Sequence, residues 1–169
     1  HSMSLYDVLI IGHVIGTVLG VGAATFAEIY YTRFNRDNII DDAEAQTLKV
    51  TYTIMRLGLF LLAVTGFGLL LYFRLTEHVG ILHSPVFWTK MTIVGILIAN
   101  ALLLQARLIP FGIGTAVSLT SWYAALIIGA AGRIQASFFE LFAYYLIAIV
   151  VVYFTLRGIR TWMHSPQRL

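Results

Sequence analysis

The stretch LYDVLIIGHVIGTVLGVGAATFAEIYY, residues 5–31, decides the fold. It is longer than the roughly 20 mostly apolar residues that an α-helix needs to cross a bilayer. Three glycines recur every four residues along it, Gly12, Gly16 and Gly20. This spacing lets a second helix approach closely. Steps of three and four residues return to one side of a helix, so His13 and Glu28 lie on the same stripe as the glycines. The stripe predicts a helix that faces protein, with the other helices packed around it.

The composition indicates an integral membrane protein with a single domain over residues 1–169. Of its 169 residues, 59% are hydrophobic and only 11% are charged, and the mean hydropathy is +0.85. A soluble domain carries about a quarter of its residues as charged side chains. The sequence has no cysteine, which excludes disulfides and thiolate metal ligands. The net charge of +3 does not point to nucleic acid, so the expected surroundings are the lipid bilayer.

Five apolar segments predict an all-α fold, a membrane helical bundle with five transmembrane helices. The expected spans cover about 5–31, 50–73, 85–106, 115–131 and 137–156. The third span has a clear helix start, because Ser84 suits the N-cap and Pro85 the first position of a helix. The polar loop 33–49 carries acidic residues that could begin a short surface helix, and 157–169 is a basic tail. His1 and Ser2 are expected to be the remnant of an expression tag. The first span has no preceding basic segment, so it is expected to be retained rather than removed as a signal peptide.

The distribution of Lys and Arg predicts the orientation, because these residues accumulate in cytoplasmic loops. One side of the five spans carries seven: Arg33, Arg36, Lys49, Arg107, Arg157, Arg160 and Arg168. The other side carries two, Arg74 and Arg133. The N-terminus is therefore expected outside and the C-terminus in the cytoplasm, with the protein in a bacterial inner membrane.

Polar residues inside the spans or at the adjacent membrane surface form two sets, and those inside need a physical reason because charge in a bilayer is costly. The inner set is Glu28 and Arg56, both expected about 7–10 Å inside the cytoplasmic ends of adjacent helices. One interpretation is a structural ion pair, and the other is a step on a proton or ion path. The outer set lies near the opposite surface: His13, His78, His83, Lys90, Arg133 and Glu140.

The outer set contains the residue types of a metal or cofactor site. Histidine is the commonest metal ligand and also ligates haem iron. His13, His78 and His83 are therefore the candidate metal ligands, for copper or zinc. Purely structural roles are the alternative: His13 could bond a neighbouring helix, and Lys90 and Glu140 could neutralise each other. The two loop histidines could also be solvated.

Two segments resemble known membrane families. LIIGHVIGTVLGVG followed by an aromatic-Arg end resembles the first helix of the bacterial membrane protoporphyrinogen oxidase family. FWTKMTIVGILIANALLL looks like that family's Trp-x-x-Lys helix, although Trp88 is two residues before Lys90. The same helix is similar to the copper-resistance D family. The first resemblance implies a b-type haem ligated by His13, with Lys90 near a porphyrin carboxylate. The second implies metal passage or delivery at the outer face.

Three functions follow from these patterns. The first is a haem- or metal-binding protein with a redox or cofactor-handling role, in which His13 is an axial ligand and His83 or His78 a possible second. Lys90 and Arg133 would then neutralise propionates, with Glu140 at the same depth. The second is a proton or cation transporter that uses buried Glu, His and Lys side chains. The third is a structural membrane subunit. A homo-oligomer could form through the Gly12, Gly16 and Gly20 face.

Overall fold

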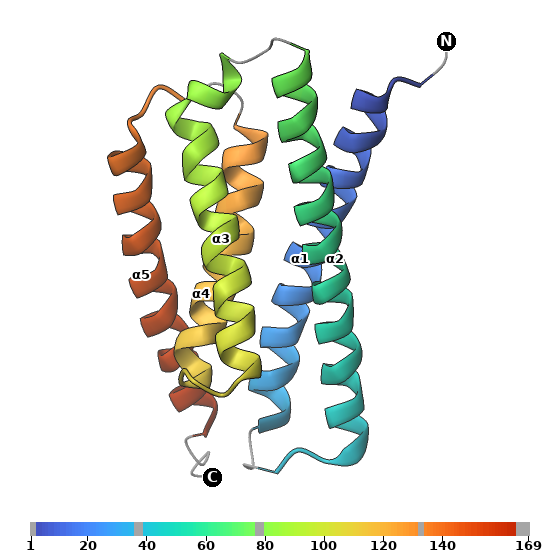
Figure 1. Ribbon diagram of the computed structural model, residues 1–169. Coiled ribbons are helices and arrows are strands. Elements are labelled where there is room, and N and C mark those ends of the chain that lie inside the picture. The colour runs from blue at the N-terminus through green and yellow to red at the C-terminus, as the bar shows by residue number, and fades with distance from the viewer. Residues whose placement is uncertain (1–2, 36–38, 77–79, 132–133, 165–169) are drawn as a thin grey trace.

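In the computed structural model the chain forms five long α-helices (Figure 1). The structure describes residues 3–35, 39–76, 80–131 and 134–164, and for His164 the backbone alone. The elements in chain order are α1 (Leu5–Phe34), α2 (Asp42–Leu75), the 3₁₀ turn η2 (Ile81–His83), α3 (Pro85–Gln105), α4 (Phe111–Ala130) and α5 (Phe138–His164). All five α-helices are long and apolar enough to cross a membrane, as expected for a multi-pass membrane protein. The prediction of an all-α bundle is confirmed for the described residues.

Four helices, α1, α2, α4 and α5, are longer than expected, and local capping explains the largest difference. α2 begins at Asp42 rather than near residue 50, because Asp41 and Glu44 form a capping box at its start. The acidic residues of the 33–49 segment therefore begin the second long helix instead of a separate surface helix. α4 begins at Phe111, directly after Pro110. α5 continues to His164 and includes most of the segment expected to be a tail.

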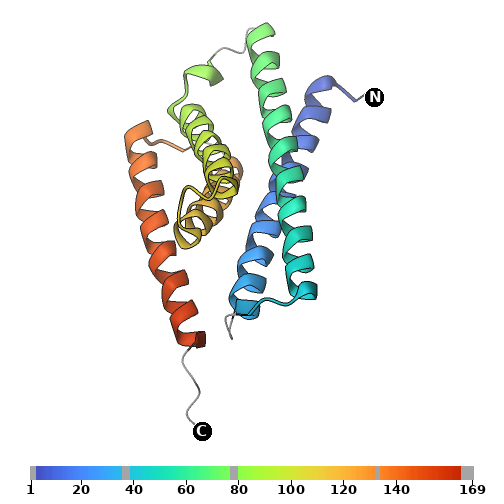
Figure 2. The ribbon, with the colours of Figure 1, turned by 60° about the horizontal axis from the view of Figure 1, so that its bottom comes forward.

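The helices form two groups that meet at α4. α1 and α2 pack against each other along their lengths, while α4 contacts α1, α3 and α5. Within the described ranges, α2 and α3 make almost no direct contact with each other. Figure 1 and the turned view of Figure 2 both show the α1–α2 pair beside the α3–α5 group. α1 begins at one end of the bundle and α5 ends at the other (Figure 1), and these are called the N-terminal end and the C-terminal end below.

Glycines bring the backbones of α1 and α2 together. A Cβ atom added to Gly16 would lie 2.8 Å from the backbone nitrogen of Leu62 and 3.0 Å from the carbonyl oxygen of Gly58. A Cβ atom on Gly58 would lie 2.7 Å from the backbone nitrogen of Gly20. These distances are too short for real side chains, so the two helices can pack this closely only because both carry glycine. The prediction that one side of the helix over residues 5–31 faces protein is confirmed. The prediction that the other helices pack around it is wrong, because α1 packs mainly on α2 and α4, and α4 is the helix that contacts three others.

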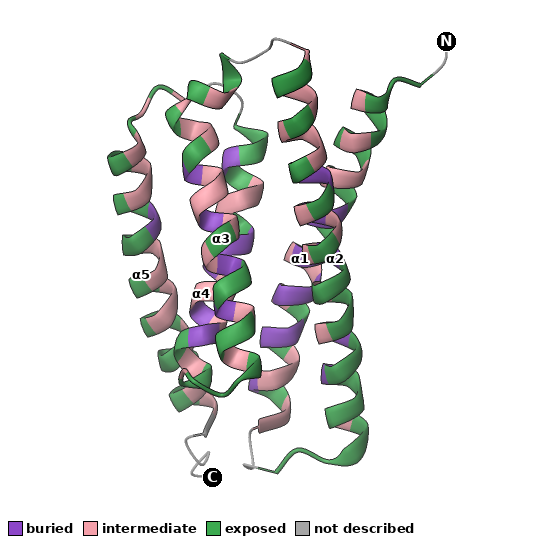
Figure 3. Ribbon diagram, viewed as in Figure 1, coloured by how far each residue is buried: buried purple, intermediate pink, exposed green. Residues whose placement is uncertain are grey.

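The glycine face is occupied within one chain. Gly12 packs on Thr65 of α2, and Gly20 packs on the indole ring of Trp122 from α4. Trp122 is fully buried and lies in a core cluster with Ala24, Leu62 and Leu97. A homo-oligomer would therefore have to use a different face from the one proposed from the sequence. Figure 3 shows the exposed residues on the outward faces of the helices, and many of these are large apolar side chains that suit contact with lipid.

Candidate functional site

His13 lies on the side of α1 that faces α2, and its ring forms a hydrogen bond with α2. Its Nδ1 atom is 3.1 Å from the Thr65 hydroxyl oxygen. That hydroxyl is also 2.6 Å from the Leu61 carbonyl, and with its proton donated there the oxygen accepts a hydrogen bond from His13. The Nδ1 atom of His13 therefore carries the proton, and in the neutral ring Nε2 carries the lone pair.

Small and charged neighbours complete the surroundings of His13. A Cβ atom on Gly66 would lie 3.3 Å from the His13 ring, so glycine leaves room for the imidazole here. Lys90, half-buried in the second turn of α3, is near enough for its ammonium to act electrostatically on the imidazole. His13 and Lys90 are thus the two members of the outer set whose side chains interact electrostatically within the described residues.

The structure does not place the other members of the outer set beside His13 and Lys90. Glu140 is exposed in the first turn of α5, where its carboxylate accepts hydrogen bonds from the backbone nitrogen and the hydroxyl of Ser137. The Ser137 hydroxyl in turn accepts from the Glu140 nitrogen. His83 is exposed at the end of η2. His78 and Arg133 lie outside the described residues. In the part of the chain that the structure describes, no three His, Asp or Glu residues are grouped so that they could hold a metal ion.

The hydrogen bonds of Glu140 predict that it caps the start of α5 and does not bind a cofactor. We expect Glu140→Ala to lower the thermal unfolding temperature slightly, because the reciprocal bonds with Ser137 are lost. Glu140→Gln should behave like the wild type, since an amide oxygen can accept the same bonds. The measurement is thermal unfolding in detergent followed by circular dichroism. A large stability loss or loss of a bound cofactor in Glu140→Gln would show instead that the negative charge itself is needed.

The inner set is organised differently from the prediction. The cation that pairs with Glu28 is Arg160 of α5, whose Nη2 atom lies 2.6 Å from Glu28 Oε1. Arg56, the partner expected from the sequence, is exposed on α2. It lies two residues, or roughly 200°, around the helix from Gly58, which faces α1. The prediction of a Glu28–Arg56 pair is therefore corrected. Arg160 was missed because it was assigned to the tail, and only the continuation of α5 past residue 156 could have indicated it.

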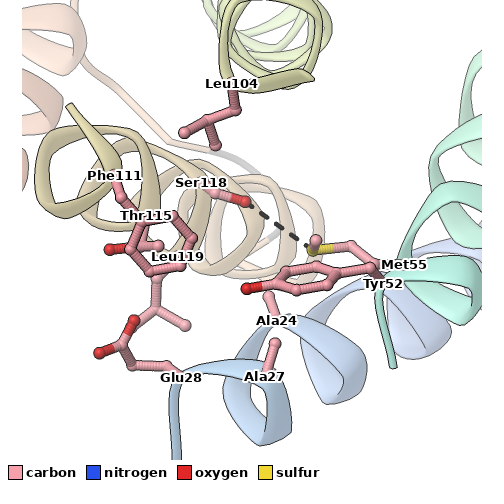
Figure 4. Close-up of a pocket in the computed structure, with 10 residues that line it drawn as sticks. All are labelled: Ala24, Ala27, Glu28, Tyr52, Met55, Leu104, Phe111, Thr115, Ser118 and Leu119. Carbon is pink, nitrogen blue, oxygen red and sulfur yellow. Dashed lines mark hydrogen bonds between the residues drawn. The ribbon is translucent and has the colours of Figure 1, made fainter. Parts of the chain in front are cut away.

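Glu28 lines a small cavity between α1, α2, α3 and α4 (Figure 4). The cavity has a volume of about 40 Å³, and its lining includes Glu28, Tyr52, Met55, Thr115 and Ser118. A haem could not fit, because this volume has room for about one to three water molecules. The cavity at Glu28 is therefore a separate feature from the surroundings of His13.

The comparisons with known proteins leave the family open. No protein-family model matches the sequence, and neither a curated protein nor a solved structure matches it. The resemblance of the first and third helices to the two membrane families therefore stays a prediction.

Proposed function

We propose that this chain is a multi-pass inner-membrane protein that binds haem b through Nε2 of His13 and has a redox or cofactor-handling role. The observation that carries the proposal is the hydrogen bond from His13 Nδ1 to Thr65. A histidine that ligates a metal through one nitrogen almost always donates its other N–H to an oxygen, which fixes the ring and its tautomer. His13 has this arrangement before any ligand is bound.

Haem suits these residues better than copper or zinc. A protein zinc site needs three or four protein ligands, and the described residues offer no such group. Haem iron is already held by four porphyrin nitrogens, so a single histidine can complete a site. The haem would supply the electron-transfer chemistry, and the chain would supply the ligand, the orientation and an apolar environment.

Lys90 gives the proposed site a cation. Haem carries two propionates, and an ammonium near the His13 ring favours the binding of an anionic group. In this proposal Arg133 would pair with the second propionate, and His83 would be the second axial ligand. The distribution of Lys and Arg puts this end of the bundle outside, with the N-terminus.

A path for ions across the whole bundle is less well supported. His13 and Glu28 are 15 residues apart on α1, or about 22 Å along its axis. Between them lies the core cluster of Ala24, Leu62, Leu97 and Trp122. This apolar layer separates the two polar ends, whereas a transport path would need polar groups or water through it.

The test is the absorption spectrum of the detergent-purified protein, as isolated and after dithionite, followed by titration with haem. We expect a Soret band and reduced α and β bands in the wild type and in His83→Ala. The bands should be lost in His13→Ala. If His83→Ala keeps the haem but shifts its bands, His83 is the second ligand. A wild-type protein that binds no haem, either as isolated or on titration, would overturn the proposal. Copper or zinc in a metal analysis of that colourless sample would favour the metal alternative.

Thr65 should act on the cofactor through His13. Thr65→Val keeps the side-chain volume but removes the oxygen that accepts the Nδ1 proton. We expect haem affinity to fall about 10- to 100-fold, as is usual when a group that orients a ligating histidine is removed. The haem titration measures this effect, and Thr53→Val is the matched control, because Thr53 is exposed on the same helix. Equal affinity in the two variants would mean that the Thr65 bond does not orient the ligand.

A further inference from the structure

The inner ion pair leaves one carboxylate oxygen without a partner. Glu28 is only 8% exposed. Its Oε1 atom accepts three hydrogen bonds, two from Arg160 and one from the Thr32 hydroxyl. Its Oε2 atom is buried and, among the described residues, accepts none. A buried carboxylate oxygen without a hydrogen bond destabilises the folded state, so a donor is needed here.

The cavity beside Glu28 has the polar groups to bind that donor. The Tyr52 hydroxyl has no hydrogen bond within the described part of the chain, and Figure 4 shows its ring lying across the cavity with the hydroxyl on the side of Glu28. The Ser118 hydroxyl has a weak contact, 3.9 Å to the sulfur of Met55. A buried water typically makes two to four hydrogen bonds to groups of this kind. The Glu28 carboxylate and these two hydroxyls meet that requirement.

The charge balance at Glu28 favours water over a cation as the group that occupies the cavity. The Glu28 charge is already balanced by Arg160, so a second cation in the cavity would be repelled. Arg160 is also held independently, since it donates to the Thr115 hydroxyl at 2.9 Å and lies over the rings of Tyr31 and Phe111 at 5.2 and 5.9 Å. Its guanidinium is therefore fixed at the pair and will not swing away to admit another ion.

From these contacts we propose an internal hydration site at the C-terminal end of the bundle. One to three water molecules, the number that about 40 Å³ can hold, bridge Glu28 Oε2 to the hydroxyls of Tyr52 and Ser118. The water supplies the missing donor to the carboxylate and keeps the ion pair solvated inside an otherwise apolar bundle. This site is independent of the proposed haem site.

X-ray hydroxyl-radical footprinting with mass spectrometry tests the proposal. Radiolysis of a bound water oxidises the side chains next to it, even where bulk solvent does not reach. We expect Tyr52 and Met55 to be oxidised several-fold faster than Tyr145, a buried tyrosine whose hydroxyl bonds to Ser121. In Ser118→Leu, which fills the cavity, the rates at Tyr52 and Met55 should fall to that of Tyr145.

Two results would overturn the hydration site. If Tyr52 and Met55 in the wild type are oxidised no faster than Tyr145, the cavity is dry. If both stay fast in a folded Ser118→Leu protein, the water that labels them is not in this cavity. Should that variant fail to fold, the smaller Ser118→Val answers the same question. The fall in the Tyr52 and Met55 rates between the wild type and Ser118→Leu decides whether the cavity holds water, and haem binding plays no part in the result.

Discussion

Gly16→Leu is expected to lower the free energy of unfolding by about 3 kcal/mol or more. The reason is the contact between the backbones of α1 and α2. Any Cβ atom on Gly16 meets the Leu62 nitrogen at 2.8 Å and the Gly58 carbonyl at 3.0 Å. Backbone atoms of a helix cannot move aside as a flexible side chain can. The two helices must separate, and the packing of His13 against Thr65 and Gly66 would loosen with them.

The matched control for this prediction is on the same helix. A Cβ atom on Gly22 meets nothing within 4 Å, so Gly22→Leu adds the same side chain without a clash. We expect its stability to equal or exceed that of the wild type, because leucine has the higher helix propensity. Unfolding in mixed detergent–SDS micelles, followed by circular dichroism, measures both. Equal stability of Gly16→Leu and Gly22→Leu would contradict the close packing of α1 and α2.

Arg160→Met should destabilise the protein by about 3–5 kcal/mol, because it leaves the Glu28 charge buried and uncompensated. The Arg160 side chain is 18% exposed and that of Glu28 is 9% exposed, so solvent screens the pair little. Arg157→Met is the control: Arg157 is exposed one turn earlier on α5, and its loss should change stability by less than about 0.5 kcal/mol.

A double variant separates the ion pair from the packing. In Glu28→Gln/Arg160→Met the uncompensated charge is gone, so we expect much of the stability lost in Arg160→Met to return. The same unfolding experiment measures it. If Arg160→Met is as stable as Arg157→Met, or if the double variant is no more stable than Arg160→Met, Glu28 does not depend on Arg160.

Residue spacing predicted which side of α1 faces protein, because that spacing is a property of the sequence alone. The stripe of Gly16, Gly20 and Glu28 on α1 faces the bundle as expected. The two glycines at 66 and 68 also make close contacts, with His13 and Leu9 of α1. His13 was singled out because a histidine on such a stripe is unusual, and its bond to Thr65 gives the residue a structural reason.

Partners between helices were harder to predict, because spacing along one helix does not say which helix lies beside it. Arg56 was chosen for Glu28 since it follows in the next helix at a similar depth. Arg160 is 132 residues away from Glu28 and reaches it through α5. Glu140 was placed in the outer set by depth, whereas a serine three residues earlier already indicated a cap. The cavity beside Glu28 depends on four helices at once, and no local pattern encodes it.

The central claim is that Nε2 of His13 is a haem ligand, and chemical rescue tests it most directly. His13→Gly is purified, titrated with haem, and its spectrum is recorded with and without added imidazole. The account predicts that the Soret and reduced α bands of the wild type are lost in this variant and return when imidazole fills the space of the missing ring. Wild-type bands in His13→Gly without imidazole would show that the iron is held elsewhere and would contradict the claim.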